Sequence, residues 1–473
     1  MCIINKAMTV LMAAVLLVTS ASGCQGSSND KTGYDTQSLG MVIGVSYESQ
    51  YCIGSSGLVY IQGHTMKYYD FEASQSYVMC NKPNCRHTDD SCVAYCEDRS
   101  ISGLALYGGR VYYFENNYDN WTLDLYCMDL SGENREIVMS MDKGLFEPGS
   151  WMLNGVETVF YTSGSAWLVG DYQYNNEQLF SEGASRGPSV QSKQLTSIDL
   201  ASGLATDYFE LDKEGRTTNV VQLATDGILV LQQLTNPETM LNEQEFYDAL
   251  EKGEFPEFEN DVPQYGDEGE ERQEYSYFEY LSQYALNQSI YSITLLDMAN
   301  GSTSILFASD CPREEFGIHR YYVEYYFCGI YEERLIYTMH DPNAGQYGSY
   351  SIYAFDTDAR TSDFLYTIED GYISFSAGQG NCVTAEGDII FNLATDDGSY
   401  DVYRYSLATE TSKHLFRIAG ENYASIMGEV GDCFILRSGS IDIELNTYTS
   451  MVSMIPKTDY LAGNLEAAWV LEL

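Results

Sequence analysis

The chain has 473 residues and a formal net charge of −45 at pH 7. A surface with so many carboxylates repels phosphate backbones and anionic lipid headgroups, which argues against nucleic-acid binding. It accepts cations, basic peptides or neutral glycans, although the same charge also keeps an exported protein soluble. The apolar content of 44% is that of a globular protein, so the acidity is not a sign of disorder.

The N-terminus reads as an export signal. Lys6 precedes an apolar stretch, Met8 to Val18, that is too short to span a bilayer as a helix. Small residues, Ala-Ser-Gly, stand directly before Cys24, which resembles the bacterial lipobox, where a peptidase cuts before a cysteine that carries a diacylglycerol. We expect residues 1–23 to be a lipoprotein signal peptide, Cys24 the lipid attachment site and residues 24–38 a flexible tether. The protein is then anchored on the extracytoplasmic face of the cell membrane; an ordinary signal peptide that contains a cysteine is the alternative.

One pattern recurs seven times after the tether: a short apolar, tyrosine-rich run, then a second run that ends in Asp or a polar turn. A period of roughly 40–50 residues is typical of β-propeller blades. We predict an all-β chain with a single β-propeller over residues 39–473, of seven blades, with six or eight as alternatives. The pairs of runs are Gly57–Tyr60 with Lys67–Asp70, Arg110–Tyr113 with Leu125–Asp129, Thr158–Tyr161 with Leu195–Asp199, Ile228–Val230 with Ile293–Asp297, Leu335–Tyr337 with Ile352–Asp356, Asp388–Phe391 with Val402–Tyr405, and Cys433–Ile435 with Ile441–Ile443.

The two ends of the repeat region predict how the ring closes. The seventh pair of runs is short, so Leu461–Leu473 is a candidate for a closing strand. Gly40–Tyr47 is the expected partner at the other end, sealing the ring between the first and last blades.

Two insertions interrupt the repeat. Residues 236–288 separate the runs of the fourth pair and form an acidic insertion that is partly helical, because Pro237–Lys252 has apolar residues at helical spacing. Gly170–Ser192 is a smaller, polar insertion in the third unit. Insertions in repeat folds fall in loops on one face, often the binding face; a solvated loop without function is the alternative.

A cluster of cysteines with one histidine follows the first unit. Cys80, Cys85, His87 and Cys92 lie close together in the sequence. Three thiolates and an imidazole suit tetrahedral Zn²⁺, and four protein ligands make a structural site because no position is left open for a substrate. The spacing is not that of a standard zinc finger, and exported proteins usually oxidise neighbouring thiols.

Disulfides are therefore the direct alternative, and free thiols are a third. They would pair Cys80, Cys85, Cys92 and Cys96 among themselves, with Cys52 as a further partner. His87 is the residue that disulfides leave unexplained. Elsewhere, Cys127 and Cys433 fall inside strand patterns and are expected to be buried, whereas no pattern assigns a role to Cys328 or Cys382.

The chain has 41 tyrosines. Doublets such as Tyr68-Tyr69 and Tyr112-Tyr113 place one ring on each side of a strand. Such rings are expected to pack between blades; rings left exposed on a face of the propeller would instead stack on sugars or peptides.

Two sequence motifs resemble a known group of proteins. Leu125–Asn134, which reads Leu-Tyr-Cys-Met-Asp-Leu-Ser-Gly-Glu-Asn, is similar to the repeat of TolB-like propellers. The order Cys80, Lys82-Pro83, Cys85, His87, Cys92 resembles a motif of uncharacterised TolB-like β-propeller lipoproteins of anaerobic Gram-positive bacteria. The resemblance implies the fold and the location, and it implies no mechanism.

Two classes of function remain open. The first is a binding or scaffold module for a protein, peptide or glycan partner. The second is an extracytoplasmic glycan-processing hydrolase or lyase, with carboxylates gathered at the central channel. An enzyme predicts two facing acids, at least one with a strongly raised pKa. Because the sequence singles out no such pair, we predict a binding module, with no catalytic residues assigned.

Overall fold

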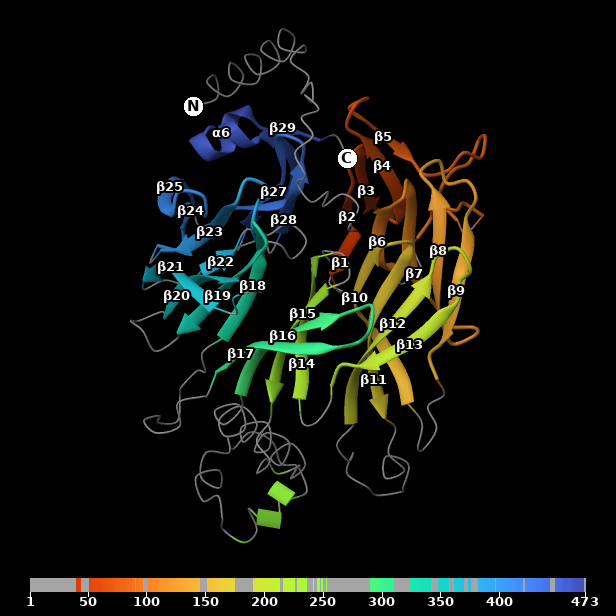
Figure 1. The fold of residues 1–473 in the computed structure, drawn as a ribbon. Coiled ribbons are helices and arrows are strands. Elements are labelled where there is room, and N and C mark those ends of the chain that lie inside the picture. Colours follow the sequence, from red (N-terminus) through yellow and green to blue (C-terminus); the bar gives the residue numbers. More distant parts are fainter. Residues whose placement is uncertain are drawn as a thin grey trace, which may run out of the picture.

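The computed structural model describes residues 40–43, 51–89, 91–96, 101–144, 151–174, 190–212, 216–225, 228–235, 241, 245–246, 248–249, 252, 290–309, 324–341, 348–356, 359, 361–369, 373–375, 382–395, 397–419, 422–442 and 447–471. Their strands form seven antiparallel sheets arranged as blades of a ring (Figure 1). The prediction of a seven-bladed β-propeller is therefore confirmed. The predicted signal peptide, Cys24 and the tether lie outside the described residues. No helix among the described residues is both long and apolar enough to cross a membrane.

Each blade is built from four consecutive strands. Blades 1 to 4 contain β2 (Tyr51–Ile53), β3 (Gly57–Gln62), β4 (Thr65–Asp70) and β5 (Gln75–Val78); β6 (Ile101–Tyr107), β7 (Arg110–Asn117), β8 (Thr122–Asp129) and β9 (Glu136–Asp142); β10 (Trp151–Thr162), β11 (Ser165–Tyr174), β12 (Val190–Asp199) and β13 (Ala205–Glu210); and β14 (Arg216–Thr225), β15 (Ile228–Thr235), β16 (Ile290–Asp297) and β17 (Thr303–Ser309). Blades 5 to 7 contain β18 (Glu324–Tyr331), β19 (Arg334–Asp341), β20 (Ser349–Asp356) and β21 (Thr361–Glu369); β22 (Ile373–Phe375), β23 (Asp388–Ala394), β24 (Tyr400–Ser406) and β25 (Thr411–Ile418); and β26 (Asn422–Val430), β27 (Cys433–Asp442), β28 (Thr447–Pro456) and β29 (Trp469–Val470).

Among the described strands, the first and last blades exchange none, so the ring closes without a shared strand in the part of the chain that the structure describes. The C-terminal segment does supply the outer strand of blade 7, as predicted, through β29 after helix α6 (Lys457–Ala462) and the short 3-10 turn η4 (Leu465–Ala467). The role predicted for the N-terminal segment is wrong. Strand β1 (Gly40–Ile43) pairs with β10 and so adds a fifth strand to the inner edge of blade 3 (Figure 1).

The predicted pairs of runs are mostly the second and third strands of the blades, which are the most deeply buried. Two pairs are misplaced. The run at Thr158–Tyr161 belongs to the inner strand β10, and the second strand of blade 3 is β11. The two runs of the seventh pair belong to one strand, β27, and the third strand is β28. The segment predicted as a polar insertion at Gly170–Ser192 contributes its ends to β11 and β12.

The recurring Asp caps the turn between the third and fourth strands. Asp199 accepts hydrogen bonds from the backbone amide and hydroxyl of Ser202, and Asp297 accepts one from the amide of Ala299. A short acidic side chain folds back on its own turn in this way, which is why Asp is favoured there. The Asp that recurs at the end of the second run therefore marks the turn between the third and fourth strands of a blade.

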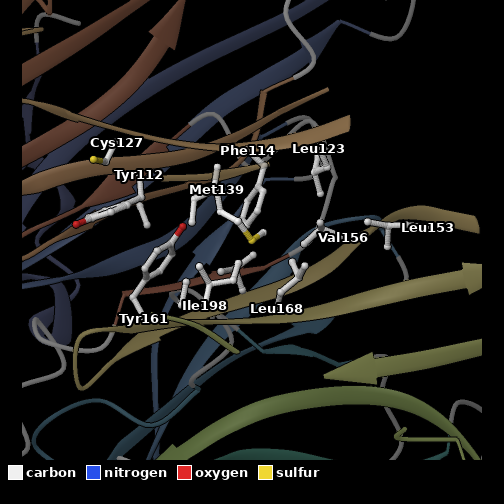
Figure 2. Packing of buried hydrophobic residues seen from close by; sticks show 14 residues of the cluster. Tyr112, Phe114, Leu123, Cys127, Met139, Leu153, Val156, Tyr161, Leu168 and Ile198 are labelled. Carbon is white, nitrogen blue, oxygen red and sulfur yellow. The ribbon is translucent and has the colours of Figure 1, made fainter. Parts of the chain in front are cut away.

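Seven clusters of buried side chains fill the seven interfaces between blades. The cluster between blades 2 and 3 is drawn in Figure 2, where Tyr112 and Phe114 face Tyr161, Leu168 and Ile198. The cluster between blades 7 and 1 closes the ring by packing alone and is made of Leu58, Tyr60, Tyr69, Cys433, Ile435, Val452, Met454 and Leu471.

The tyrosine doublets serve two interfaces at once. Tyr112 packs in the cluster between blades 2 and 3, whereas Tyr113 packs in the cluster between blades 1 and 2. Successive side chains of a strand point to opposite faces, so a doublet supplies one ring to each neighbour. The prediction that these rings pack between blades is confirmed.

The large insertion leaves blade 4 between β15 and β16, as predicted. Few of its residues are described. Glu245, Phe246, Asp248 and Ala249 are helical, with Phe246 and Ala249 buried and the two acids exposed. This alternation agrees with the predicted amphipathic helix. Leu241 and Lys252 are also described but are not helical, and the other residues of the predicted helix lie outside the described residues.

Candidate metal centre

The cysteine cluster lies in a loop that leaves the outer strand of blade 1 after β5 and returns to the same edge of the sheet. Strand β5 pairs with β4 only as far as Val78, and the chain then leaves the sheet at Met79. It returns at Ala94–Cys96, where the amide of Met66 donates to the carbonyl of Ala94 at 2.7 Å and Tyr95 forms a bridge with Thr65. The returning residues take the place that a longer β5 would have filled. The loop is therefore built into the edge of blade 1 and is more than a connection to blade 2.

Four side chains of this loop converge on one point. The ligand atoms of Cys80, Cys85, His87 and Cys92 all lie within 4.8 Å of one another, and Nδ1 of His87 is 3.2 Å from Sγ of Cys92. With Zn–S near 2.3 Å and Zn–N near 2.0 Å, the donor atoms of a tetrahedral site lie about 3.6–3.8 Å apart. The observed donor set fits such a site, slightly expanded. The structure thus brings together all four residues predicted as ligands.

The backbone is shaped for this convergence. His87 has a positive φ of 54° and Asn84 one of 60°. Non-glycine residues adopt this left-handed conformation seldom and at a cost of about 1–3 kcal/mol, so it persists where surrounding contacts require it. Here it turns the His87 imidazole back toward the three thiols.

The thiols differ in how readily they lose a proton. The pKa of Cys85 is lowered, first by the hydrogen bond from the backbone amide of His87 and then by the Cys92 and Cys80 thiols and the Lys82 ammonium. Burial raises the pKa of Cys92 to about 12. A metal ion that binds all three as thiolates must displace these protons, so metal affinity rises with pH.

The loop is held against blade 2 through the turn between β8 and β9. Gly132 has φ +78°, and a Cβ atom there would lie 2.0 Å from the carbonyl oxygen of Met79. Next to it, the amide of Asn81 donates to Glu133. Cys92 itself is buried in the cluster between blades 1 and 2. The donor set therefore lies at a blade interface, which suits a structural role.

Lys82 braces the loop internally. Its ammonium donates to the carbonyl of Ser91, across the base of the loop. A metal ion with three thiolates carries one net negative charge, and this ammonium, which lies close enough to lower the pKa of Cys85, would partly offset it. The loop thus supplies a compensating charge of its own.

The remaining cysteines named in the disulfide alternative lie apart from the donor set. Cys96 is buried and its thiol donates to the carbonyl of Ala94. Cys52 is buried in blade 1, where its sulfur accepts a hydrogen bond from the amide of Leu106 and burial raises its pKa to about 12. None of the nine cysteines among the described residues forms a disulfide in this structure. Cys127 and Cys433 are buried in strands, as predicted.

Two acids that the structure brings together, Glu386 and Glu429, share the Lys457 ammonium in ion pairs of 2.8 and 2.5 Å. Burial raises the pKa of Asp212, Asp388 and Glu429. Asp212 accepts hydrogen bonds from two backbone amides, Asp388 forms an ion pair with Arg404 at 2.7 Å, and Glu429 forms one with Lys457. Each of these carboxylates therefore has a structural partner.

Two features of the structure were not predicted from the sequence. The contact with Gly132 joins residues far apart in the chain, and only the Gly in that turn hinted at it. Cys328 and Cys382 lie beside each other in blades 5 and 6, although they are distant in sequence.

The chain was compared with known families, curated proteins and solved structures. No protein-family model matches the chain, and no curated protein matches it in sequence. It is similar to an oligogalacturonate lyase in complex with manganese, with 9% identity, a TM-score of 0.43, and coverage of 74% of this chain and 72% of that one. The β-propeller domain of the Trilobed protease from Pyrococcus furiosus shows 10% identity and a TM-score of 0.43 over 87% of this chain and 95% of that one. An acylaminoacyl peptidase of Pyrococcus horikoshii shows 11% identity and a TM-score of 0.44 over 84% of this chain and 48% of that one, so the chain spans about half the peptidase's length.

Proposed function

We propose that the protein is a lipid-anchored, extracytoplasmic β-propeller that binds a protein, peptide or glycan partner, with structural zinc in its first blade. The lipobox at Cys24 and the resemblance to TolB-like lipoproteins support the location. We favour binding over catalysis because of how the described carboxyl groups with a raised pKa are bonded. The three described carboxyl groups with a raised pKa are all engaged in structural bonds, and the Cys₃His donor set leaves no open coordination position.

One exposed aromatic pair is a suitable contact surface for a partner. Tyr118 and Trp121 lie in the turn between β7 and β8, with 62% and 40% of their surfaces exposed. The ammonium of Lys143 lies 5.4 Å from the centre of the Trp121 ring. Strands alternate in direction within a blade, so this turn and the blade 4 insertion between β15 and β16 share a face of the ring. Aromatic rings beside a cation stack well on sugars and peptides.

Binding assays with defined probes test this function. The full-length chain in mild detergent is titrated with soluble xylan, glucomannan, polygalacturonate and a lysine-rich peptide, and the mixtures are analysed for cleavage products. We expect saturable binding of a neutral glycan or the basic peptide without cleavage, and none of acidic polygalacturonate. Replacing both Tyr118 and Trp121 by Ser weakens binding at least about tenfold, whereas Phe364→Ser, at an exposed ring on β21, does not. Cleavage of any glycan would instead establish the hydrolase or lyase alternative.

Zinc is the metal that we propose for the donor set. Soft thiolates with one imidazole in a closed tetrahedral group are typical of structural zinc. When bound, zinc would hold Cys80, Cys85, His87 and Cys92 as ligands and fix the excursion on the edge of blade 1. We expect about one zinc per chain after anaerobic purification without added metal.

A matched pair of histidine variants tests the zinc site. His64 is exposed in the same blade and also has a positive φ, 70°. His87→Asn should lose the metal and expose the three cluster thiols to a thiol reagent, because asparagine tolerates the same backbone but removes the ligand. His64→Asn should keep both metal and protection. Zinc-free protein with the cluster cysteines already oxidised would favour the disulfide alternative.

A further inference from the structure

Cys328 and Cys382 form a second site of sulfur chemistry, far from the metal centre. Cys328 lies on β18, the inner strand of blade 5, and Cys382 lies just before β23 of blade 6. The backbone amide of Cys382 donates to the carbonyl of Cys328 at 2.6 Å. The side chain of Cys328 is fully buried, whereas that of Cys382 is partly exposed. We infer that these two thiols are a redox-modifiable pair that closes to a disulfide and ties blade 5 to blade 6.

The backbone geometry meets the demands of a disulfide. A single backbone hydrogen bond of 2.6 Å joins the two residues directly, so we infer that their Cα atoms lie within the range of about 4.4–6.8 Å that disulfides require. Cys382 packs against the buried cluster that contains Cys328, and the interaction with the Cys382 thiol, followed by burial, raises the pKa of Cys328. The sulfurs thus already lie side by side in the reduced protein.

A β-bulge frees Cys328 for this contact. The pairing of β18 with β19 shifts between Phe327 and Gly329, so Cys328 is the extra residue. Its carbonyl is therefore available to Cys382 rather than to the neighbouring strand. Corresponding inner strands carry the same irregularity, with Glu157 in blade 3 and Met427 in blade 7 as the extra residue. In blade 5 this repeated position holds a cysteine opposite a second cysteine.

The chain around Cys382 is held in place. Val383 forms a bridge with Ile389, and the amide of Thr384 donates to the carbonyl of Asp388 at 2.8 Å. At the turn that follows, the Tyr331 ring at the end of β18 fills the space where Gly387 lacks a side chain. These contacts fix both cysteines across the blade interface, so closing the disulfide requires little movement.

The chemistry is thiol–disulfide exchange with an external disulfide. The Cys382 thiolate, which is the more accessible, attacks the external disulfide, forms a mixed disulfide and releases one thiol. The Cys328 thiolate then attacks the Cys382 sulfur and releases the second thiol. Two protein thiols are oxidised, one external disulfide is reduced to two thiols, and the two protons pass to those thiols. The raised pKa of Cys328 makes the second step faster at higher pH.

Mass spectrometry of the oxidised protein tests the pair. The full-length chain, reduced and purified anaerobically, is exposed to oxidised glutathione, quenched with acid, alkylated and digested. We expect a peptide cross-linked through Cys328 and Cys382, and a higher melting temperature that returns to its starting value on reduction. Cys328→Ser should trap glutathione on Cys382, Cys382→Ser should leave Cys328 unmodified, and Cys127→Ala should keep the cross-link.

The wild-type cross-link decides the outcome even if a serine variant folds poorly. Full alkylation of both cysteines after oxidation of the folded chain would overturn the inference. So would a disulfide from Cys382 to any other cysteine. Neither result depends on zinc or on the binding partner, so failure here leaves the proposed function standing.

Discussion

Gly132 gives the sharpest test of how the metal loop is held. It lies in the turn between β8 and β9 with φ +78°, and an added Cβ would lie 2.0 Å from the carbonyl oxygen of Met79 and 3.0 Å from the amide nitrogen of Cys80. Both contacts are with backbone atoms, which cannot rotate away. Gly132→Ala must therefore push the first ligand of the metal centre out of place.

Gly109 provides a matched control. It has φ +77°, and a Cβ there would meet nothing within 4 Å. Alanine in the left-handed conformation costs about 1–2 kcal/mol at either position. Only Gly132→Ala adds the clash, and overpacking of this kind costs about 1–3 kcal/mol more. The difference between the two variants isolates the contact with the loop.

The clash should appear mainly in zinc affinity. In the metal-free variant we expect the loop to move away from the methyl group that Gly132→Ala adds. Binding zinc then requires Cys80 to return to its position against that methyl group, so the cost of the clash is subtracted from the free energy of zinc binding. A penalty of about 1–3 kcal/mol lowers affinity roughly fivefold to 150-fold, since 1.4 kcal/mol is tenfold. Competition with a chelator of known affinity measures this, and Gly109→Ala should match the wild type. Equal zinc affinity in the two variants would refute the claim that this turn positions the loop.

Three further predictions follow from the charges and the N-terminus. Lys457→Met should destabilise the fold by about 3 kcal/mol in urea unfolding, because it strips the cation from two carboxylates, and adding Glu429→Gln should recover part of the loss. Burial raises the pKa of Asp212, Asp388 and Glu429. As the pH falls, these three carboxyl groups therefore take up protons in the folded chain before they do so in the unfolded chain. The melting temperature should therefore rise as the pH falls from 7 toward about 5. Cys24→Ser should move the protein from the membrane fraction to the soluble fraction.

Each of these three predictions can be contradicted by a specific result. Lys413, whose ammonium reaches only the carbonyl of Leu461 at 3.4 Å, is the control for Lys457, and equal losses from both would show that the buried ion pairs contribute nothing. A melting temperature that falls steadily from pH 7 to about pH 5 would contradict the sign of the carboxyl shifts. Retention of Cys24→Ser in the membrane fraction would contradict the lipid anchor.

The blade count could be predicted because two strands of each blade are strongly apolar and end in a turn with its own chemistry. Inner and outer strands carry weaker signals, since the inner ones are bulged and the outer ones are half exposed. In blade 3 the apolar run Thr158–Tyr161 belongs to the inner strand β10, which is as apolar there as the second strand of other blades. In blade 7 the polar residues between the runs Cys433–Ile435 and Ile441–Ile443 continue strand β27, which reaches Asp442, so both runs fall on one strand.

The convergence of Cys80, Cys85, His87 and Cys92 could be anticipated because these residues are close in sequence. Their setting could not, since it depends on the return of Ala94–Cys96 to β4 and on the approach of Gly132. The place of β1 was missed for a related reason. A short strand adds to whichever free edge it reaches, and nothing in Gly40–Ile43 distinguishes the edge of β10 from that of another blade.

Because the first and last blades share no described strand, contacts across the blade interfaces must hold the ring closed. The interface of blades 7 and 1 is held by side-chain packing, and the other interfaces rely on similar clusters. Several of them carry an additional link, such as the hydrogen bond of 2.9 Å from the Gly164 amide to the Tyr107 hydroxyl between blades 2 and 3. The metal loop joins blades 1 and 2, Lys457 of blade 7 forms an ion pair with Glu386 of blade 6 at 2.8 Å, and Cys328 meets Cys382 between blades 5 and 6. In a quasi-one-dimensional ring each blade contacts only its neighbours, so a link at one interface resists opening there and cannot be replaced by packing elsewhere.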